Sequence, residues 1–419
     1  MLQRGVLKLN NKKRWITWTI VIVILTNTLT FFGSKFISLS LPNGNVVVTR
    51  QNYNELLDFQ KLFTVRQRLY DYYDGNIKEE DLLNGAVKGM TSALNDPYTV
   101  YWDAKEYSDF NTQMEGDYSG IGVTVSNKDG KITIVNVSQD SPAKKAGIIV
   151  NDQIVKVNGT EVSGKELDKA VSLMRGINGT NVTVTFYRKN KGTFDAVLKR
   201  AKLDVPTVTG EILNENKKIG YMQISMFGEK TAAEFEKELK VLKDKGAKGF
   251  IIDLRDNGGG SLDECIDMVS NFVPKGKVIV STIDKYKKEK KYDSKGGIAI
   301  GMPLVILVNG NTASASEIFS GAVRDYKLGT LIGTKTFGKG IVQSIIDEKL
   351  LGFGDGTALK VTVSKYYTPN GENIQGKGIN PDIMVKYPEE LSTKTYNRST
   401  DPQFEKALEV ISPKVVKAN

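Results

Sequence analysis

Apolar residues follow three different spacings along the chain, and each spacing predicts a different kind of element. Residues 15–33 carry no charge, and an uncharged stretch of this length can cross a bilayer as a helix. Residues 53–73 and 78–94 repeat apolar positions every three or four residues, which predicts two amphipathic helices. Short apolar runs farther along predict buried strands at residues 250–254, 278–282 and 304–308.

The charges around residues 15–33 set an orientation. Residues 1–14 are basic, so we expect them to be a cytoplasmic tail and the rest of the chain to lie outside. No A-x-A pattern follows the apolar run, which favours a retained signal anchor; a cleaved signal peptide is the alternative. We therefore expect a single-pass protein of the cell membrane.

The two amphipathic helices form a helical region over residues 50–105. Two isolated helices cannot bury their apolar faces against each other alone. They must pack on another domain or on a second copy of the chain, and we expect a homodimer or a higher homo-oligomer.

Two further regions differ in periodicity. Residues 116–205 are rich in strands, with turns at Asn-Gly pairs. From residue 218 strands alternate with helices, including a helix over residues 231–245 that Gly246 ends. This alternation predicts a β/α domain with a mostly parallel sheet. After residue 388 the chain is polar, with one short helix near residues 402–411.

The amino-acid composition argues against several kinds of site and partner. The 419 residues fit two or three domains, and the one cysteine, Cys265, excludes an intrachain disulfide. The chain has no histidine, the commonest ligand for zinc, iron and copper, so we expect no metal and no cofactor. The net charge of +10 comes from lysines scattered among acids. We interpret it as a solvated surface and expect no nucleic-acid partner.

A glycine-rich stretch, G-D-Y-S-G-I-G-V at residues 116–123, can form an anion-binding nest of backbone N–H groups; a ligand-free hairpin loop is the alternative. With S-P-A-K-K-A-G, D-Q-I-V-K-V-N-G and L-M-R-G-I-N-G-T farther on, it resembles a PDZ domain over about 90 residues. The resemblance implies that residues Gly120, Ile121, Gly122 and Val123 bind a peptide's terminal carboxylate, and that Ile121 and Val123 shape a pocket for an apolar terminal side chain.

Ser314 and Ser316 lie where a strand gives way to a helix, a suitable place for a nucleophile, yet no histidine can accept the proton. A carboxylate, a lysine or the α-amine remains. Lys339 stands between Gly338 and Gly340, which let backbone pack closely, and burial can lower a lysine pKa by up to ~3–5 units. A solvated turn lysine is one alternative. A nucleotide-binding loop is another, but glycine stands where its hydroxyl residue belongs.

These segments resemble the carboxyl-terminal processing peptidases, or tail-specific proteases. The resemblance rests on N-T-A-S-A-S-E-I at residues 311–318, T-F-G-K-G-I-V-Q at 336–343 and D-L-R-D-N-G-G-G-S-L at 253–262, and covers about residues 50–390. It implies that Ser314 is the nucleophile and Lys339 the base of a catalytic dyad, and that Gln343 orients the base. It also implies three oxyanion donors, the backbone N–H groups of Ala315, Gly259 and Gly260. Asp325 matches an acid of the family that is either supporting or structural.

The expected architecture is an α+β multidomain chain with a β/α protease core at 204–390, a PDZ domain at 106–203, the N-terminal helical region, one transmembrane helix, and a tail at 391–419. The resemblance implies that the protease core is crotonase- and ClpP-like, whereas the strand and helix pattern alone indicates only an α/β fold. The expected function is a membrane-anchored serine endopeptidase, with its protease domain outside the cytoplasm, that recognises protein or peptide substrates by apolar C-termini. Arg175 could gate the site, and a regulatory protein could control it. The alternative function is a membrane-anchored PDZ scaffold with an inactive core.

Overall fold

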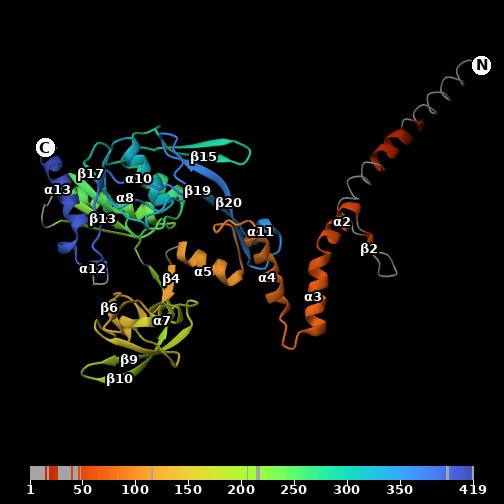
Figure 1. Ribbon diagram of the computed structural model, residues 1–419, viewed down its shortest axis with the longest axis horizontal. Helices are drawn as coiled ribbons and strands as arrows, with labels where there is room; N and C mark the ends of the chain where they lie inside the picture. Colours follow the sequence, from red (N-terminus) through yellow and green to blue (C-terminus); the bar gives the residue numbers. More distant parts are fainter. Residues whose placement is uncertain are drawn as a thin grey trace, which may run out of the picture. The chain divides into compact units, whose positions relative to one another are not determined.

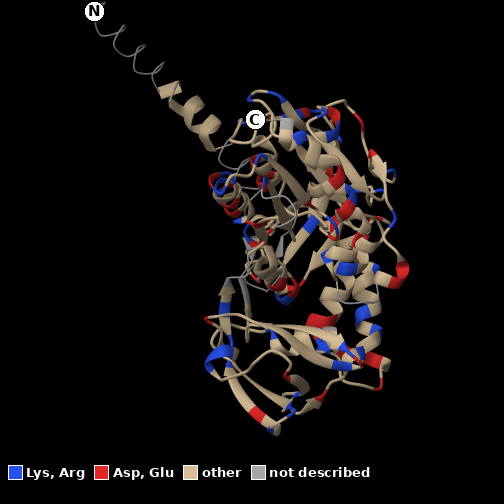
Figure 2. Cartoon of the chain, turned by 90° about the vertical axis from the view of Figure 1, so that its left-hand side faces the viewer, with Lys and Arg blue, Asp and Glu red and all other residues tan. Residues whose placement is uncertain are grey.

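The computed structural model describes residues 15–16, 18–26, 39–40, 46–47, 49–114, 117–204, 206–213, 218–392 and 396–417. The chain divides into two compact units, residues 1–86 and residues 87–419. Most of the helices and strands belong to the second unit (Figure 1). Lysine and arginine are interspersed with acidic residues over its elements, as expected for a solvated surface (Figure 2).

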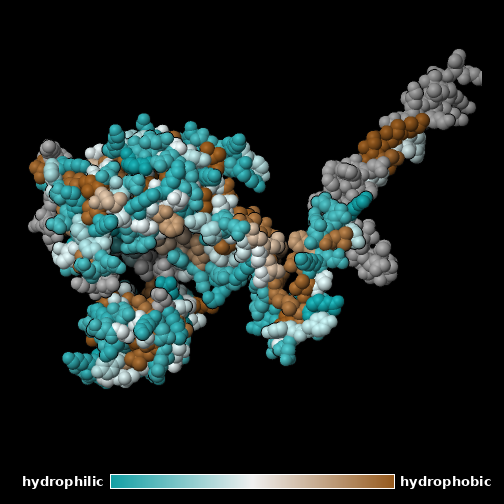
Figure 3. All heavy atoms as spheres, viewed as in Figure 1, coloured by the Kyte–Doolittle hydropathy of each residue, from teal (hydrophilic) through white to brown (hydrophobic). Residues whose placement is uncertain are grey.

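The first unit holds a short pair of strands, β1 (Leu39–Ser40) and β2 (Val46–Val47), and the helices α2 (Arg50–Asp58) and α3 (Gln60–Tyr72). The sequence predicted one helix where α2 and α3 lie, but the chain leaves helical geometry at Phe59. Large apolar side chains such as Leu56 and Phe63 are about half exposed on these helices (Figure 3). Their pairing with a second copy stays a prediction.

The predicted anchor is described only in part. Residues 15–16 and 18–26 are helical and carry exposed apolar side chains, the brown stretch between grey atoms in Figure 3. The basic tail and residues 17 and 27–33 lie outside the described residues. Within the described part of the chain, no helix combines the length and the apolar character that crossing a membrane requires.

The second amphipathic helix is confirmed as α4 (Glu79–Ser92), with three acids in its first turn, where they favour helix formation. A turn then leads into β3 (Val100–Trp102) and α5 (Ala104–Met114). On α5, Phe110 stacks on Trp102 with ring centroids 4.6 Å apart.

The strand-rich region folds around its own apolar core. Its main sheet has the order β10-β9-β7-β6-β5, with β8 beside β7, and β4 pairs separately with β11. The strands are β4 (Asp117–Gly120), β5 (Val123–Lys128), β6 (Lys131–Val137), β7 (Gln153–Val157), β8 (Thr160–Glu161), β9 (Asn181–Arg188), β10 (Gly192–Lys199) and β11 (Ala201–Asp204). The helices are α6 (Pro142–Lys145), η1 (Gly164–Glu166) and α7 (Leu167–Met174), close to their predicted positions.

The β/α domain contains the predicted, mostly parallel sheet, in the order β12-β13-β14-β17-β18-β21. Only β12 is antiparallel to its neighbour. The strands are β12 (Val208–Ile212), β13 (Ile219–Ile224), β14 (Gly249–Asp253), β17 (Leu304–Val308), β18 (Thr330–Gly333) and β21 (Ile383–Met384). Both faces of β14 and β17 are buried, which explains their unbroken apolar runs.

One face of this sheet packs against α8 (Thr231–Asp244), α9 (Leu262–Ser270) and α10 (Ala315–Asp325). The other face packs against α13 (Pro402–Lys417) through Phe404, Ala407, Ile411 and Val415. The tail helix was predicted to end near residue 411, but it continues through Pro413, and Val415 in the added turn is buried against the sheet. Before α13 the chain forms α12 (Glu389–Ser392) and η2 (Arg398–Thr400).

A second, antiparallel sheet was not predicted. Its order is β16-β15-β20-β19, and β3 pairs with the long strand β20. The strands are β15 (Val278–Asp284), β16 (Glu289–Asp293), β19 (Ile341–Ile346) and β20 (Ala358–Tyr367), and α11 (Glu348–Leu351) lies between the last two. The apolar run at β15 was expected in the parallel sheet, but its apolar side chains join the main core from this second sheet.

Candidate active site

Ser314 lies at the turn between β17 and α10 and is the residue immediately before the helix. Its φ of 55° and ψ of −116° are unusual for a residue with a side chain, and such strain persists only where the surroundings enforce it. Thr312 provides part of that support, because its buried hydroxyl donates to Leu254 O at 2.9 Å and accepts from Asn309 N at 2.9 Å. The turn is therefore tied to the end of the neighbouring strand β14.

Asn257 links this turn to the glycine loop after β14. Its backbone oxygen accepts from Ala313 N at 3.0 Å and from the Ser316 hydroxyl at 3.0 Å. Ser316 is fully buried, so it is a packing residue behind the turn, and Ser314 is the residue in the N-cap position. The two serines thus have different surroundings, and only Ser314 lines a pocket.

The expected oxyanion donors are not equivalent. Gly259 N donates to the side chain of Asn257 at 2.9 Å, so this N–H group already has a partner. For Gly260 and Ala315, no partner of the N–H group is present among the described residues, and both residues line the pocket. A side chain on Gly259 would place Cβ 2.9 Å from Ala315 N, so glycine is needed there for close packing.

The loop that carries Lys339 is also tightly packed. A Cβ on Gly338 would lie 2.7 Å from Gly378 N, and one on Gly340 would lie 2.5 Å from Gln375 N. The glycines on both sides of Lys339 therefore let neighbouring backbone approach, as the sequence indicated. Strand β19 follows Lys339, whereas a nucleotide-binding loop needs a helix there, so the nucleotide alternative fails on geometry.

Glu317 joins the serine turn to the lysine loop, and the sequence analysis missed it. Its side chain is fully buried and accepts four hydrogen bonds. The donors are Ser314 N at 2.9 Å, the Thr336 hydroxyl at 2.6 Å, Gly338 N at 2.8 Å and Lys339 N at 2.9 Å. A signal was present, because a serine followed three residues later by glutamate is typical of a helix start at which the glutamate binds backbone.

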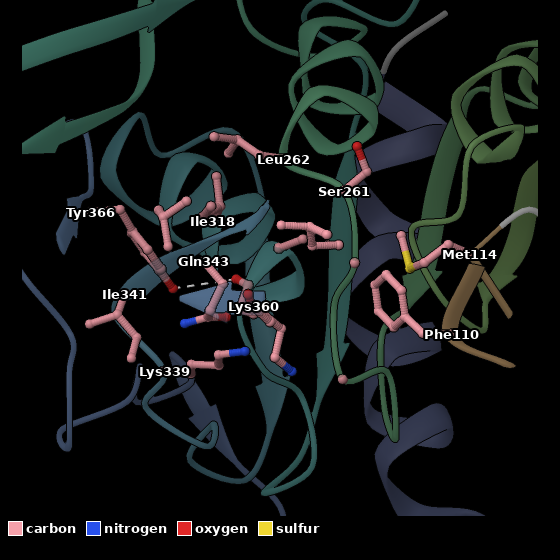
Figure 4. Close-up of a pocket in the computed structure, with 16 residues that line it drawn as sticks. Phe110, Met114, Ser261, Leu262, Ile318, Lys339, Ile341, Gln343, Lys360 and Tyr366 are labelled. Carbon is pink, nitrogen blue, oxygen red and sulfur yellow. Dashed lines mark hydrogen bonds between the residues drawn. The ribbon is translucent and has the colours of Figure 1, made fainter. Parts of the chain in front are cut away.

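Ser314, Lys339 and Gln343 line one pocket of about 280 Å³, together with Lys360 from β20 (Figure 4). The Tyr366 hydroxyl donates to Ser314 O at 3.3 Å at one side of it. Most other side chains of the lining are apolar: Phe110, Met114, Leu262, Ile318, Ile341, Val342 and Ile345. The lining therefore combines the hydroxyls of Ser261, Ser314 and Tyr366, two amines and an amide with an apolar wall.

Lys339 has an environment that disfavours its charged form. Burial first, and then the positive charge of Lys360, lower the pKa of Lys339 from its ordinary value of 10.5. Asp96 and Glu317 oppose the shift without cancelling it. The amine lies 4.8 Å from the centre of the Tyr98 ring.

Gln343 has a buried side-chain nitrogen, Nε2, without a hydrogen-bond partner in the described part of the chain. Within the same residues, no hydrogen bond joins the Lys339 amine to Ser314 or to Gln343. The structure therefore brings the three side chains into one pocket but does not connect them directly. An unsatisfied amide group that is buried costs about 1–3 kcal/mol, so Gln343 is poised to gain a partner there.

Asp325 does not belong to the pocket. It lies at the last residue of α10, about 16 Å along the helix from Ser314 at ~1.5 Å per residue. Its buried carboxylate pairs with Arg324 at 2.8 Å and accepts from Asn370 N at 2.9 Å. Of the two roles left open for Asp325, these contacts favour the structural one, because the carboxylate holds the loop after β20.

The predicted carboxylate-binding loop connects β4 to β5. Ile121 is buried, and its backbone oxygen accepts from Ala143 N at 2.9 Å. Gly122 has a φ of 81°, and a Cβ there would lie 2.0 Å from the Cβ of Ser141, so only glycine fits. Arg175 is exposed at the end of α7, and its role in gating stays a prediction.

Sequence comparisons match three regions of the chain to known families. Residues 218–385 match peptidase family S41, residues 119–194 match the PDZ domain, and residues 23–106 match the N-terminal domain of the activating protease CtpB. A putative S41 protease from Bacteroides fragilis has a similar fold, with a TM-score of 0.54 at 19% identity, over 82% of this chain and 92% of that one.

Two bacterial proteases are similar to the chain over most of their length. The carboxy-terminal processing protease CtpA of Bacillus subtilis is 39% identical, over 79% of this chain and 70% of that protein. A carboxy-terminal-processing protease of Bartonella bacilliformis is 34% identical, over 89% of this chain and 86% of that protein. The chain therefore belongs to peptidase family S41 and is a serine-type protease of the carboxy-terminal processing kind that also carries a PDZ domain.

Proposed function

We propose that the chain is a membrane-anchored endopeptidase that binds the C-terminal ends of protein substrates through its PDZ domain and cleaves them with Ser314 as nucleophile and Lys339 as base. The observation that carries this proposal is the shared pocket. Ser314 and Lys339 line it together, and burial favours the neutral amine that a base requires.

In the proposed reaction the neutral Lys339 amine accepts the proton of the Ser314 hydroxyl as its oxygen attacks the scissile carbonyl carbon. The N–H groups of Ala315, at the start of α10, and of Gly260 stabilise the negative oxygen that forms. Lys339 then gives the proton to the departing amine, and water hydrolyses the acyl-enzyme with the same lysine as base. The amine has to leave the Tyr98 ring to reach Ser314, and catalytic hydrogen bonds commonly tighten only when substrate binds.

Gln343 suits the role of orienting this base. Its unpartnered Nε2 needs a hydrogen-bond acceptor. A neutral lysine amine has a lone pair that can accept, whereas an ammonium group can only donate. A hydrogen bond from Gln343 to Lys339 would therefore favour the neutral form and hold it in place.

The PDZ domain has a free sheet edge for a substrate end. In the described sheet β5 is the last strand and pairs with β6 alone. An extended peptide can add to such an edge, and its carboxylate can reach the N–H groups of residues 120–123. Val123, Val125, Leu167 and Val171 are partly buried apolar residues of β5 and α7 that favour an apolar terminal side chain.

Ser314→Ala and Lys339→Ala should each lower kcat/KM by about a thousandfold or more, because one removes the nucleophile and the other the base. In the unmodified enzyme, kcat/KM should rise with pH, because the ammonium form of Lys339 cannot accept a proton. The midpoint should lie below 10.5, since the pKa of Lys339 is lowered. Cleavage of a reporter peptide across a pH series measures both. Ser316→Ala is the matched control and should keep most activity; the assignment fails if Ser316→Ala is the inactive variant.

Glu317→Gln should lower kcat/KM by about a hundredfold and the free energy of unfolding by about 2–4 kcal/mol. An amide has one accepting oxygen, and its NH2 group would face backbone donors that now bind a carboxylate. Glu372→Gln is the control, because Glu372 is half-exposed and pairs with Arg324 at the surface. Peptide cleavage and thermal unfolding provide the measurements, and equal effects of the two variants would contradict the role of Glu317.

A peptide with a free, apolar C-terminus should bind the Ser314→Ala chain at least about tenfold more tightly than the same peptide with a C-terminal amide. The reason is that the N–H groups of residues 120–123 favour a negative carboxylate. Fluorescence anisotropy with the two labelled peptides measures the ratio. Equal affinities would remove the PDZ loop as the carboxylate site.

Residues 15–33 should retain the protein in the membrane. We expect the full chain to remain in the membrane fraction after alkaline carbonate extraction, and a variant without residues 1–33 to be released, because only the former carries the uncharged stretch. External protease should degrade the remaining domains in cells whose outer layers are removed. A mature N-terminus beyond residue 33 would instead indicate a cleaved signal peptide.

A further inference from the structure

A second lysine, Lys360, occupies the pocket beside Lys339. It lies on β20, opposite Val100 of β3, and is half-buried. Its amine lies 4.7 Å from the centre of the Trp102 ring, much as the Lys339 amine lies over Tyr98. In Figure 4 the two lysine side chains converge on the same part of the pocket.

Asp96 is the carboxylate that both lysines face, at the turn that leads into β3. It accepts from the Thr99 hydroxyl at 2.7 Å and from Tyr98 N at 3.0 Å. Its negative charge attracts both amines, although it forms no direct ion pair with either among the described residues. The turn is fixed to β20, because the Thr99 hydroxyl accepts from Thr362 N at 3.1 Å.

The other ionisable groups near Lys339 do not cancel the effect of burial and of Lys360. The Glu317 carboxylate attracts the Lys339 amine as Asp96 does, yet the pKa of Lys339 is still lowered. Tyr366 and Tyr98 are phenols, and burial raises the pKa of Tyr366 further, so it stays neutral. Two ammonium groups side by side in a half-buried site repel each other, and this repulsion is removed when one lysine loses its proton.

The surroundings determine which lysine loses it. Burial lowers the pKa of both lysines and Asp96 opposes the shift of both, so neither distinguishes them. The charge of Lys360 is a further cause that lowers the pKa of Lys339. The result is a charged Lys360 paired through space with Asp96 and a neutral Lys339. A base activated by an adjacent cation is an established way to make a lysine reactive near neutral pH.

We propose that Lys360 is a positioning residue of the catalytic centre, whose ammonium group keeps the Lys339 amine in its neutral, proton-accepting form while Asp96 serves as the counter-ion that keeps Lys360 charged. This inference rests on the proposed function of Lys339. It assigns the turn and strand before α5 to the catalytic centre, although they are far from it in sequence.

The test measures the protonation of Lys339 without using cleavage. The full chain with Ser314→Ala is labelled briefly with acetic anhydride across a pH series, and mass spectrometry follows acetylation of Lys339. Lys360→Met should raise the midpoint for Lys339 by about one pH unit, because a like charge is removed. Asp96→Asn should lower the midpoint for acetylation of Lys360, followed in the same spectra, because it removes the counter-ion. Lys360→Arg, which keeps the charge, should leave the midpoint for Lys339 in place.

The dependence of kcat/KM on pH provides a second, independent measurement. In the active enzyme Lys360→Met should lower kcat/KM about tenfold at neutral pH and regain the parent value at high pH, where Lys339 is neutral without help. A midpoint unchanged by Lys360→Met, or shifted equally by Lys360→Arg, overturns the proposal, as does a loss of activity that is the same at every pH. If Lys339→Ala remains active, the proposed base is wrong, whereas the labelling result still reports on the lysine pair.

Discussion

The active site depends on the buried carboxylate of Glu317. Its two oxygens bind the N–H of Ser314 on one side and the N–H groups of Gly338 and Lys339 on the other. The strands before these two segments, β17 and β18, are neighbours in the sheet, and Phe337 N also donates to Thr312 O at 3.0 Å. Burying a carboxylate without hydrogen-bond donors costs free energy, so Glu317 requires the N–H groups of both loops. The same hydrogen bonds fix the two loops in position. Glu317 thereby binds the backbone of both the proposed nucleophile and the proposed base.

This link explains how the domain tolerates unfavourable local features. Ser314 has a strained backbone, and the lysine loop needs glycine at positions 338 and 340 because neighbouring backbone lies within 3 Å of where a side chain would begin. Partial burial of a lysine also costs free energy at neutral pH, because the unfolded chain would be fully protonated. Each of these features costs free energy at one place only, and burial of the large apolar core beneath the sheet offsets the cost.

The sequence predicted the parts of the fold that local patterns encode. Buried runs became β14 and β17, and the helix expected at residues 231–245 became α8 (Thr231–Asp244). It did not predict the second sheet for two reasons. The sequence of β20 mixes polar and aromatic residues and lacks a continuous apolar run, and its partner β3 lies more than 250 residues earlier in the chain. For the same reason Lys360 and Asp96 had no local signal: tertiary pairing alone brings them to Lys339. The role of Asp325 stayed open from sequence, because its distance from the pocket depends on the length of α10, at whose last residue it lies.

The structure also sharpens the choice of base in a chain without histidine. Glu317 is near Ser314, but its two oxygens already accept four hydrogen bonds that hold the serine turn and the lysine loop. Asp325 is bound at the far end of α10, and Cys265 donates to Ala315 O while burial raises the pKa of its thiol. What remains beside Ser314 is an amine whose charged form is disfavoured by burial and by a neighbouring cation. The proposed role of Lys339 therefore rests on two observations: its own surroundings favour the neutral amine, and the other candidate bases are already hydrogen-bonded or lie far from Ser314.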